Sequence, residues 1–506
     1  MRTAPRRAIA LASALAAVAV ACSGGGGNGA RVNPHSTLRS GSAPAVYSTD
    51  GITKIKHVIV VMQENRSFDN YFGTFPGADG IPMHNGVPTV CVPVPNVSGC
   101  ARPYHDTSLI DGGGPHNLGA AERDIHGGAM DGFARSAVAG RMKACDHPTV
   151  NPVCTGATTP GDVPDVLGYH TAAEIPNYWA YARNFVLQDH MFAGVNSWSL
   201  PAHLDMVSGW SAKCSDTADP MTCVTNIDRP GRAIAGATGP PPYAWTDLTY
   251  LLDRAGVSWR YFVQAGSQPD CTDPADMICP PQWQSHLAPD FWNPLPGFAD
   301  VRQDGQLHDV TSPANYFRMA RRGSLPSVSW IVPNGRNSEH PPASIANGQA
   351  WVTKVIDAAM RSPDWNNTAI FLSWDDWGGF YDHVPPPALN PQGLGMRVPG
   401  LVISPYAQRG MIDHQTLSTD SYLRFIEDDF LGGQRIDPAT DGRPDARPFV
   451  AENTPGVGNL LADFNFTQKP LPPLILAPRP DGGQRTGTRA RARAGSRISR
   501  RGTPTP

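Results

Sequence analysis

The chain has 506 residues, of which 40% are hydrophobic and 17% charged, values ordinary for a soluble globular protein with a large core. Its net charge of −3 is unevenly distributed. The segment from Arg479 onward carries eight Arg and one Asp, so about −10 remains on the rest of the chain. An acidic body argues against nucleic acid as the main partner. The Arg-rich end could contact anionic surfaces, but it is more typical of a solvated, disordered tail.

The N-terminus has the pattern of an export signal. Three arginines precede an apolar run, Ala8 to Ala21, that is too short for a comfortable membrane span. Cleavage after Ala21 suits an ordinary signal peptide, whereas the sequence Ala-Val-Ala-Cys ending at Cys22 is an imperfect lipoprotein box. We therefore expect a signal peptide over residues 1–21 and a flexible linker over 22–50. The protein would be secreted, periplasmic or at the cell surface, and lipidation of Cys22 stays open.

The eight cysteines after Cys22 fall into four neighbouring couples, each of which closes a short loop. This arrangement favours local pairing. Zinc binding is the alternative, but zinc ligand pairs usually lie about two to four residues apart. We predict disulfides formed in an oxidising compartment. The pairs are Cys91 with Cys100, Cys145 with Cys154, Cys214 with Cys223, and Cys271 with Cys279.

Apolar runs of strand length, rich in β-branched residues, are typical of strands covered on both faces. The predicted strands are Ile55–Met62, Val257–Val263, Val328–Val332, Ala369–Trp374 and Val398–Ile403. The predicted amphipathic helices are Ile175–Phe185, Thr246–Ala255, Tyr316–Arg322, Ala350–Arg361 and Tyr422–Leu431. Strands that alternate with helices predict an α/β fold with a largely parallel sheet.

Two irregular regions, residues 82–165 and 212–243, show little periodicity. Structureless stretches of such length in a compact domain are usually functional lids or binding loops, and the predicted disulfides would hold them in place. We therefore expect one domain over residues 51–469 with long, disulfide-pinned loop insertions. A disordered Arg-rich tail, residues 470–506, would follow it.

Polar clusters follow two of the predicted strands, Glu64-Asn65 after the first and Asp375-Asp376 after the fourth. Ligands of open α/β sheets bind beyond the carboxyl ends of the strands. Together the clusters would supply the oxygen ligands that hard divalent cations prefer. Each cluster alone could instead cap a helix, with Asn65 or Asp376 as the N-cap. Spacing alone leaves both interpretations open.

Both clusters lie in segments that resemble signatures of a bacterial phosphoesterase family, which contains nonspecific phospholipases C and secreted acid phosphatases. Residues 56–73 resemble its opening signature, and residues 376–387 resemble its second. The resemblance spans Ile55 to Leu431. Shorter matches follow the family's order: Met130–Phe133, Ile175–Pro176, Ser338–Pro341 and Val402–Tyr406.

The resemblance implies a fold similar to the alkaline phosphatase and sulfatase superfamily, in which helices cover both faces of a central sheet in three α/β/α layers. It also implies that Glu64, Asn65, Asp375 and Asp376 bind a divalent metal. Oxygen ligands suit Ca²⁺, Mg²⁺ or Mn²⁺, and iron stays open as well.

A family serine or threonine two residues before a proline acts as the nucleophile. Ser199 fits this spacing in Ser-Leu-Pro-Ala-His, and Ser197 is the alternative. A serine hydroxyl needs a base or a metal to become a good nucleophile. With Ser199 on the cation, in-line attack on phosphorus would give a phosphoseryl intermediate that water later hydrolyses.

By position, His116 and His340 resemble active-site histidines of the family, and histidines suit proton donation to a leaving group. His203 and His383 stay open between a site role and a structural role. Many relatives have a histidine-containing segment before a Pro-Phe pair in mid-chain. This chain has Phe291–Leu295 there instead, which puts one phosphate-contacting histidine in doubt.

The leading interpretation is an exported hydrolase of phosphoric esters, which acts either on phosphomonoesters or on phospholipids in the manner of a phospholipase C. The sequence Asp375-Asp376-Trp377-Gly378 leans toward the phosphatase side. The alternative is a catalytically silent surface binding protein that retains a structural cation. The expected partner is a phosphate-ester or phospholipid substrate, with membrane contact only through a lipid anchor at Cys22.

Overall fold

The computed structural model describes residues 51–95, 98–145, 152–155, 163–232 and 240–480, all of which lie in one compact unit. The predicted signal peptide, Cys22 and the linker lie outside these residues. Within the described ranges, every helix is too short or too polar to cross a bilayer.

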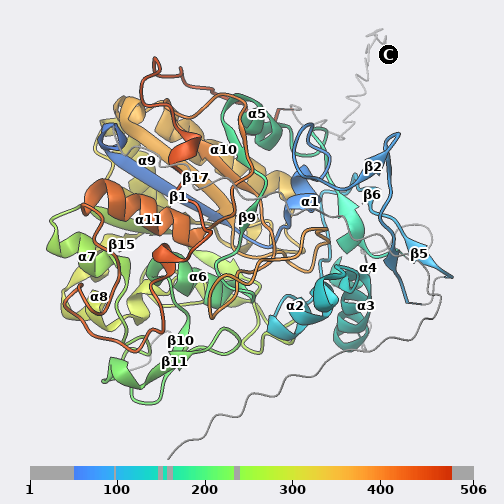
Figure 1. Cartoon of the computed structure of the whole chain (residues 1–506), viewed down its shortest axis with the longest axis horizontal. Coiled ribbons are helices and arrows are strands. Elements are labelled where there is room, and N and C mark those ends of the chain that lie inside the picture. The colour runs from blue at the N-terminus through green and yellow to red at the C-terminus, as the bar shows by residue number, and fades with distance from the viewer. Residues whose placement is uncertain (1–50, 96–97, 146–151, 156–162, 233–239, 481–506) are drawn as a thin grey trace, which may run out of the picture. The chain divides into compact units, whose positions relative to one another are not determined.

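An eight-stranded sheet forms the centre of the molecule (Figure 1). Its strands lie in the order β15-β12-β16-β1-β17-β18-β8-β19, and every pair is parallel except the two that β18 makes. The prediction of a largely parallel sheet is therefore confirmed. The strands are β1 (His57–Gln63), β8 (Val186–Gln188), β12 (Trp259–Val263), β15 (Val310–Thr311), β16 (Val328–Val332), β17 (Thr368–Trp374), β18 (Gly400–Ile403) and β19 (Ile412–Asp413).

All five predicted strands belong to this sheet, at positions β1, β12, β16, β17 and β18. The three strands that the sequence did not predict, β8, β15 and β19, have only two or three residues, too few to show a periodicity. The central strand β17 is buried at every residue, as its continuous apolar sequence requires when helices cover both faces.

Two helical layers enclose the sheet. Figure 1 shows α9 and α10 on one side of β1 and β17, and α11 on the other. Contacts place α5 with α10, and place α6 and α7 in the layer of α11. The three-layer α/β/α arrangement and all five predicted helices are confirmed. The helices of these layers are α5 (Pro176–Asn184), α6 (Ser199–Ser208), α7 (Leu248–Arg254), α9 (Pro313–Arg322), α10 (Ile345–Met360) and α11 (Thr419–Phe430).

The region 82–165 is not a structureless loop, contrary to the expectation from its weak periodicity. It contains α2 (Leu118–Ile125) and α3 (Phe133–Ala144), which enclose a second hydrophobic core. Phe133 packs there against Tyr381, with ring centroids 5.3 Å apart. The helices escape sequence detection because they bury small residues, largely alanines, against the aromatic side chains of the second signature.

The four predicted disulfides are all present. They join Cys91 to Cys100, Cys145 to Cys154, Cys214 to Cys223, and Cys271 to Cys279. The pair Cys214–Cys223 closes a hairpin of β10 (Ala212–Cys214) and β11 (Cys223–Thr225). Short local pairing thus holds the irregular insertions, as the cysteine spacing indicated.

The first part of the predicted tail is ordered against the domain. The Leu471 amide donates to the Pro405 carbonyl at 2.8 Å, and the Leu476 amide donates to Asp357 on α10 at 3.2 Å. The domain therefore continues to Pro480, beyond the expected end at residue 469. Residues 481–506 lie outside the described part.

A buried arginine joins the two signature segments. Arg397 donates to Asp382 Oδ1 and to Asp69 Oδ1, both at 3.0 Å, and its guanidinium lies 4.5 Å from the centre of the Phe68 ring. Asp69 belongs to α1 (Phe68–Phe72), directly after the first acidic cluster. His383 Nδ1 bonds Asp69 at 2.7 Å, so this histidine braces the fold.

Replacement of Arg397 with alanine is expected to lower the free energy of unfolding by about 3–5 kcal/mol, because it leaves two buried carboxylates without their cation. Arg361→Ala is the matched control, since its exposed ion pair with Asp357 is worth only about 0–1 kcal/mol. Urea titration of both variants measures the difference. Equal losses in the two would contradict the bracing role of Arg397.

Candidate active site

The parallel register of β1 and β17 brings the two acidic clusters together. Gln63, the last residue of β1, pairs with Trp374, the last residue of β17. The Asn65 amide donates to Asp375 Oδ1 at 2.9 Å, and its side-chain amide donates to Asp376 Oδ1 at 3.1 Å. The four predicted metal ligands therefore form one cluster at the carboxyl edge of the sheet.

The helix-capping interpretation of these residues is wrong. Ser67, not Asn65, caps α1 by accepting from the Asn70 amide, and the residues after Asp376 form turns. Asn65 has a φ of 62°, which asparagine tolerates better than most residues. Gly378 also has a positive φ, and a Cβ there would lie 2.5 Å from the Asn65 carbonyl oxygen. The positive φ values at Asn65 and Gly378 therefore turn the backbone so that the acidic side chains face one another.

Three oxygen atoms of this cluster lack hydrogen-bond partners among the described residues. They are Glu64 Oε2, Asn65 Oδ1 and Asp375 Oδ2, and all are buried. Burial, followed by repulsion from Asp375, raises the pKa of both Glu64 and Asp376 well above their usual values. Buried, unpartnered carboxylates are costly unless a cation compensates them. The donor set therefore fits a hard divalent cation.

Helix α6 places its first turn beside this cluster. Ser199 is its first residue, and the Ser199 hydroxyl lies 3.5 Å from Asp376 Oδ2. Ser197 Oγ is buried and has no hydrogen-bond partner within the described structure. Both serines are thus buried, but of the two only Ser199 makes a hydrogen bond with the acidic cluster in the described part of the chain.

One turn further along α6, His203 joins the same cluster. Its Nε2 lies 3.2 Å from Glu64 Oε1. Burial lowers the pKa of His203 to about 4, which keeps the imidazole neutral and able to bind a metal. One ligand atom each from Glu64, His203 and Asp375 lie within 4.8 Å of one another. The sequence had left the role of His203 open.

The two predicted catalytic histidines meet on the other side of the site. The rings of His116 and His340 lie 5.4 Å apart, centre to centre, and both face Asp270. Burial alone would lower the pKa of His116, but Asp376 and Asp270 raise it to about 10. A cavity of about 20 Å³ beside both histidines is also lined by Gly378.

Asp270 joins the site although no sequence motif indicates it. It lies in a loop of no regular structure, next to Cys271, and its carboxylate is buried. Burial and repulsion from Asp375 are the main causes of the raised pKa of Glu64 and of Asp376, and the charge of Asp270 adds to both. Asp270 can be recognised as a site residue only from its position in the fold, because no local sequence motif surrounds it.

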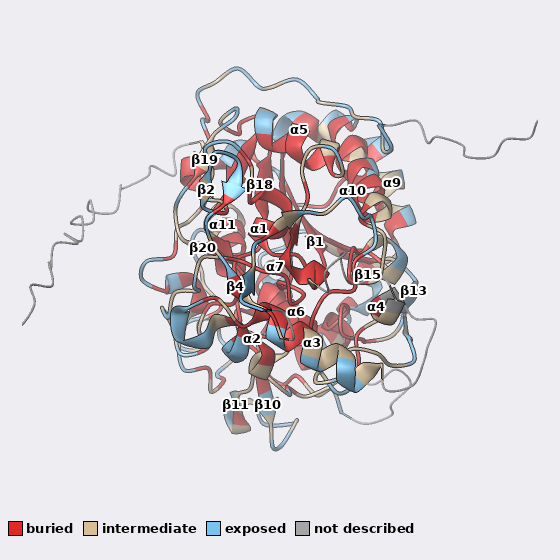
Figure 2. Cartoon of the chain, turned by 90° about the vertical axis from the view of Figure 1, so that its right-hand side faces the viewer, coloured by how far each residue is buried: buried red, intermediate tan, exposed pale blue. Residues whose placement is uncertain are grey.

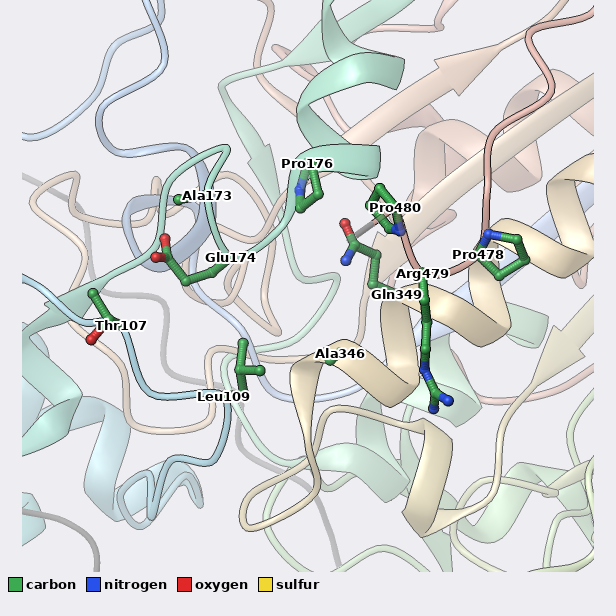
Figure 3. Close-up of a pocket in the computed structure, with 10 residues that line it drawn as sticks. All are labelled: Thr107, Leu109, Ala173, Glu174, Pro176, Ala346, Gln349, Pro478, Arg479 and Pro480. Atoms are coloured by element: carbon green, nitrogen blue, oxygen red, sulfur yellow. The ribbon is translucent and has the colours of Figure 1, made fainter. Parts of the chain in front are cut away.

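A larger pocket lies elsewhere on the domain and contains none of the predicted site residues (Figure 3). Its volume is about 370 Å³, and its walls come from the first turns of α5 and α10 and from residues 478–480. Figure 2 shows that β1, which precedes the first acidic pair, and α6, which carries Ser199 and His203, are buried. The candidate active site is therefore identified by its buried carboxylates, serine and histidines rather than by the size of its cavity.

Residues 55–431 match the Phosphoesterase family. The chain belongs to this family. The resemblance carried by the two signatures is thereby confirmed, and the protein is a hydrolase that acts on phosphoric ester bonds.

Curated relatives of this phosphoesterase are phospholipases C. The non-hemolytic phospholipase C of Pseudomonas aeruginosa is 26% identical, over 91% of this chain and 70% of its own length. Phospholipase C A of Mycobacterium tuberculosis is also 26% identical, over 83% of this chain and 79% of its own length. A solved alkaline phosphatase superfamily protein from Vibrio parahaemolyticus is 12% identical over 56% of this chain and 66% of its own, with a TM-score of 0.31.

The acidic cluster predicts how stability depends on pH when no cation is present. Glu64 has a raised pKa in the fold, against an ordinary value of 4.5, so its contribution to stability is lost as pH rises through the folded pKa. In chelator, the melting temperature of the wild type is expected to fall from roughly pH 4 upward. Glu64→Gln should fall less over the same range in thermal scans. Parallel curves would contradict the assignment of this carboxyl.

Proposed function

We propose that this phosphoesterase uses Ser199 as a nucleophile at a divalent cation held by Glu64, Asn65, Asp375 and Asp376. The observation that carries the proposal is a buried acidic cluster that has three unpartnered oxygens and whose Asp376 Oδ2 lies 3.5 Å from the Ser199 hydroxyl. A structural cation alone would not require a serine at this position.

The proposed ligands are hard oxygen donors, which suit Ca²⁺, Mg²⁺ or Mn²⁺. The neutral imidazole of His203 next to Glu64 is compatible with iron as well. When bound, the cation would lower the pKa of the serine hydroxyl and offset negative charge on the phosphoryl oxygens.

The residues of the chain support a two-step reaction. Ser199 begins α6, and a helix N-terminus favours the negative charge of a phosphoryl group. In the first step the serine oxygen bonds to phosphorus as the bond to the leaving oxygen breaks. A histidine of the pair His116 and His340 gives the leaving oxygen its proton. In the second step water hydrolyses the phosphoseryl intermediate and restores Ser199.

The proposed substrate is a phosphomonoester or the phosphodiester of a phospholipid. The curated relatives named phospholipase C support the diester. The sequence Asp375-Asp376-Trp377-Gly378 supports the monoester. Turnover of p-nitrophenyl phosphate against p-nitrophenylphosphorylcholine separates the two, because only the second carries an additional ester group.

Ser199→Ala is expected to lower kcat on the better substrate by more than about 10³-fold, because it removes the nucleophile. Ser197→Ala is the matched control, two residues away and equally buried, and should retain most activity. Mass spectrometry of acid-quenched enzyme should find phosphate on the peptide that contains Ser199. Loss of activity in the Ser197 variant alone would reassign the nucleophile.

Removal of divalent cations by a chelator is expected to abolish turnover, and re-addition of one of them should restore it. Asp375→Asn should weaken binding of that cation in calorimetric titration by about tenfold or more, because a carboxylate ligand becomes neutral. If purified enzyme with each common divalent cation turned over neither substrate, the alternative of a silent binding protein would stand.

We also propose that the protein is exported. The N-terminal arginines and apolar run support a signal peptide, and the four disulfides support an oxidising compartment. Lipidation at Cys22 is the form of membrane attachment that the sequence favours. Mass measurement of the mature N-terminus distinguishes a lipidated Cys22 from simple cleavage.

A further inference from the structure

We infer that Asp270 is a positioning residue that fixes the two histidines so that His116 is left to donate the proton to the leaving group. The inference rests on the proposed function, which leaves the donor open between His116 and His340. Asp270 makes no hydrogen bond or ion pair with the acidic cluster or with Ser199 within the described structure. It acts through the histidines.

Each histidine ring has an acceptor oxygen near both of its nitrogens. His340 Nδ1 lies 2.7 Å from the Pro341 carbonyl oxygen, and His116 Nδ1 lies 3.1 Å from the Gly114 carbonyl oxygen. The Nε2 atom of each ring faces Asp270 Oδ1. A carbonyl oxygen and a carboxylate oxygen can only accept, so a ring nitrogen that hydrogen-bonds to one of them does so through its proton.

The two rings differ in how firmly Asp270 holds them. His340 Nε2 makes a hydrogen bond of 3.1 Å with Asp270 Oδ1, whereas His116 Nε2 lies 3.6 Å away, beyond an ordinary hydrogen bond. The His116 side chain is also more exposed, 17% against 9% for His340. The proton on His116 Nε2 is therefore the one that an incoming ester can engage.

A tryptophan fixes the position of Asp270. The Trp292 indole N–H donates to Asp270 Oδ2 at 2.7 Å, and the Asp270 amide donates to Gln268 Oε1 at 2.8 Å. Trp292 is fully buried, and its ring centre lies 6.2 Å from that of His340. Trp292 belongs to the segment where the sequence departs from the histidine-containing pattern of its relatives. Its side chain holds the carboxylate instead of contacting phosphate itself.

The proton balance closes when Ser199 reacts as its alkoxide, which a bound cation would favour. In the first step Ser199 Oγ bonds to phosphorus, the P–O bond to the leaving group breaks, and His116 gives its Nε2 proton to the leaving oxygen. In the second step water bonds to phosphorus and gives one proton to His116, the other proton stays on the phosphate, and the P–O bond to Ser199 breaks to restore the alkoxide. Asp270 stays ionised throughout and stabilises the doubly protonated ring, with its own pKa lowered by the two histidines against the effect of burial.

Asp270→Asn tests the inference through its dependence on the leaving group. An ester with a poor leaving group needs the proton, whereas p-nitrophenolate leaves without it. We expect the variant to lose about 100-fold in kcat on an alkyl phosphate and less than about tenfold on p-nitrophenyl phosphate. Asp273→Asn, three residues further along the chain and in an exposed ion pair with Arg229, is the matched control and should change neither rate.

Trp292→Phe removes only the donor that anchors Asp270, so it should show the same leaving-group pattern in a weaker form. Equal losses on both esters in the two variants, at unchanged melting temperature, would overturn the inference. Loss of a second metal ion from Asp270→Asn by elemental analysis would also overturn it, since His116, Asp270 and His340 would then be metal ligands.

Nitrogen NMR of the histidine rings gives a readout that needs no turnover. In the wild type the His116 ring should be doubly protonated near neutral pH, and in Asp270→Asn it should lose a proton. The groups that face His116 are Asp270, Asp376, the His340 ring and the Gly114 carbonyl. An inactive wild type with this NMR pattern would refute the proposed function alone. Unchanged ring protonation in the variant would refute the role of Asp270.

Discussion

The parallel, in-register pairing of β1 with β17 is the constraint on which the site depends. Because Gln63 and Trp374 end their strands side by side, the next residues of both strands leave the sheet at one edge. A shift of one residue in this register would turn Glu64 or Asp376 away from the cluster. The long apolar strands and the helices on both faces therefore fix the geometry of four polar side chains.

The cost of burying this cluster is balanced from two directions. On one side are the unpartnered oxygens of Glu64, Asn65 and Asp375, which suit a cation. On the other side is His116, whose pKa is raised, against the effect of burial, by the nearby carboxylates of Asp376 and Asp270. A phosphoryl group between them would meet positive charge on both sides, which is the arrangement that phosphoryl transfer requires.

Much of the two signatures stabilises the fold rather than performing chemistry. Arg397 joins Asp69 to Asp382, and the backbone of Glu339 accepts from Arg66 at 2.8 Å. The Glu339 carboxyl receives hydrogen bonds from Tyr71, Tyr178 and Trp374, although burial raises its pKa to about 7. These networks hold the loops that carry the site at fixed positions relative to the sheet. The two signatures therefore contain residues that support the fold as well as residues of the candidate active site.

The sequence by itself determined the α/β class, the five long strands and helices, the disulfide pairs and the segments that carry the acidic residues. These features depend on local periodicity, on short cysteine spacing and on motifs a few residues long, all of which involve residues that are close together in the sequence. Only the tertiary structure decided that Asn65 and Asp376 are not helix caps, that His203 joins Glu64, and that Asp270 links His116 with His340. These contacts join residues tens to hundreds of positions apart, so no local pattern can encode them. The helices α2 and α3 were missed for a related reason, since they are stabilised by aromatic residues of a distant segment.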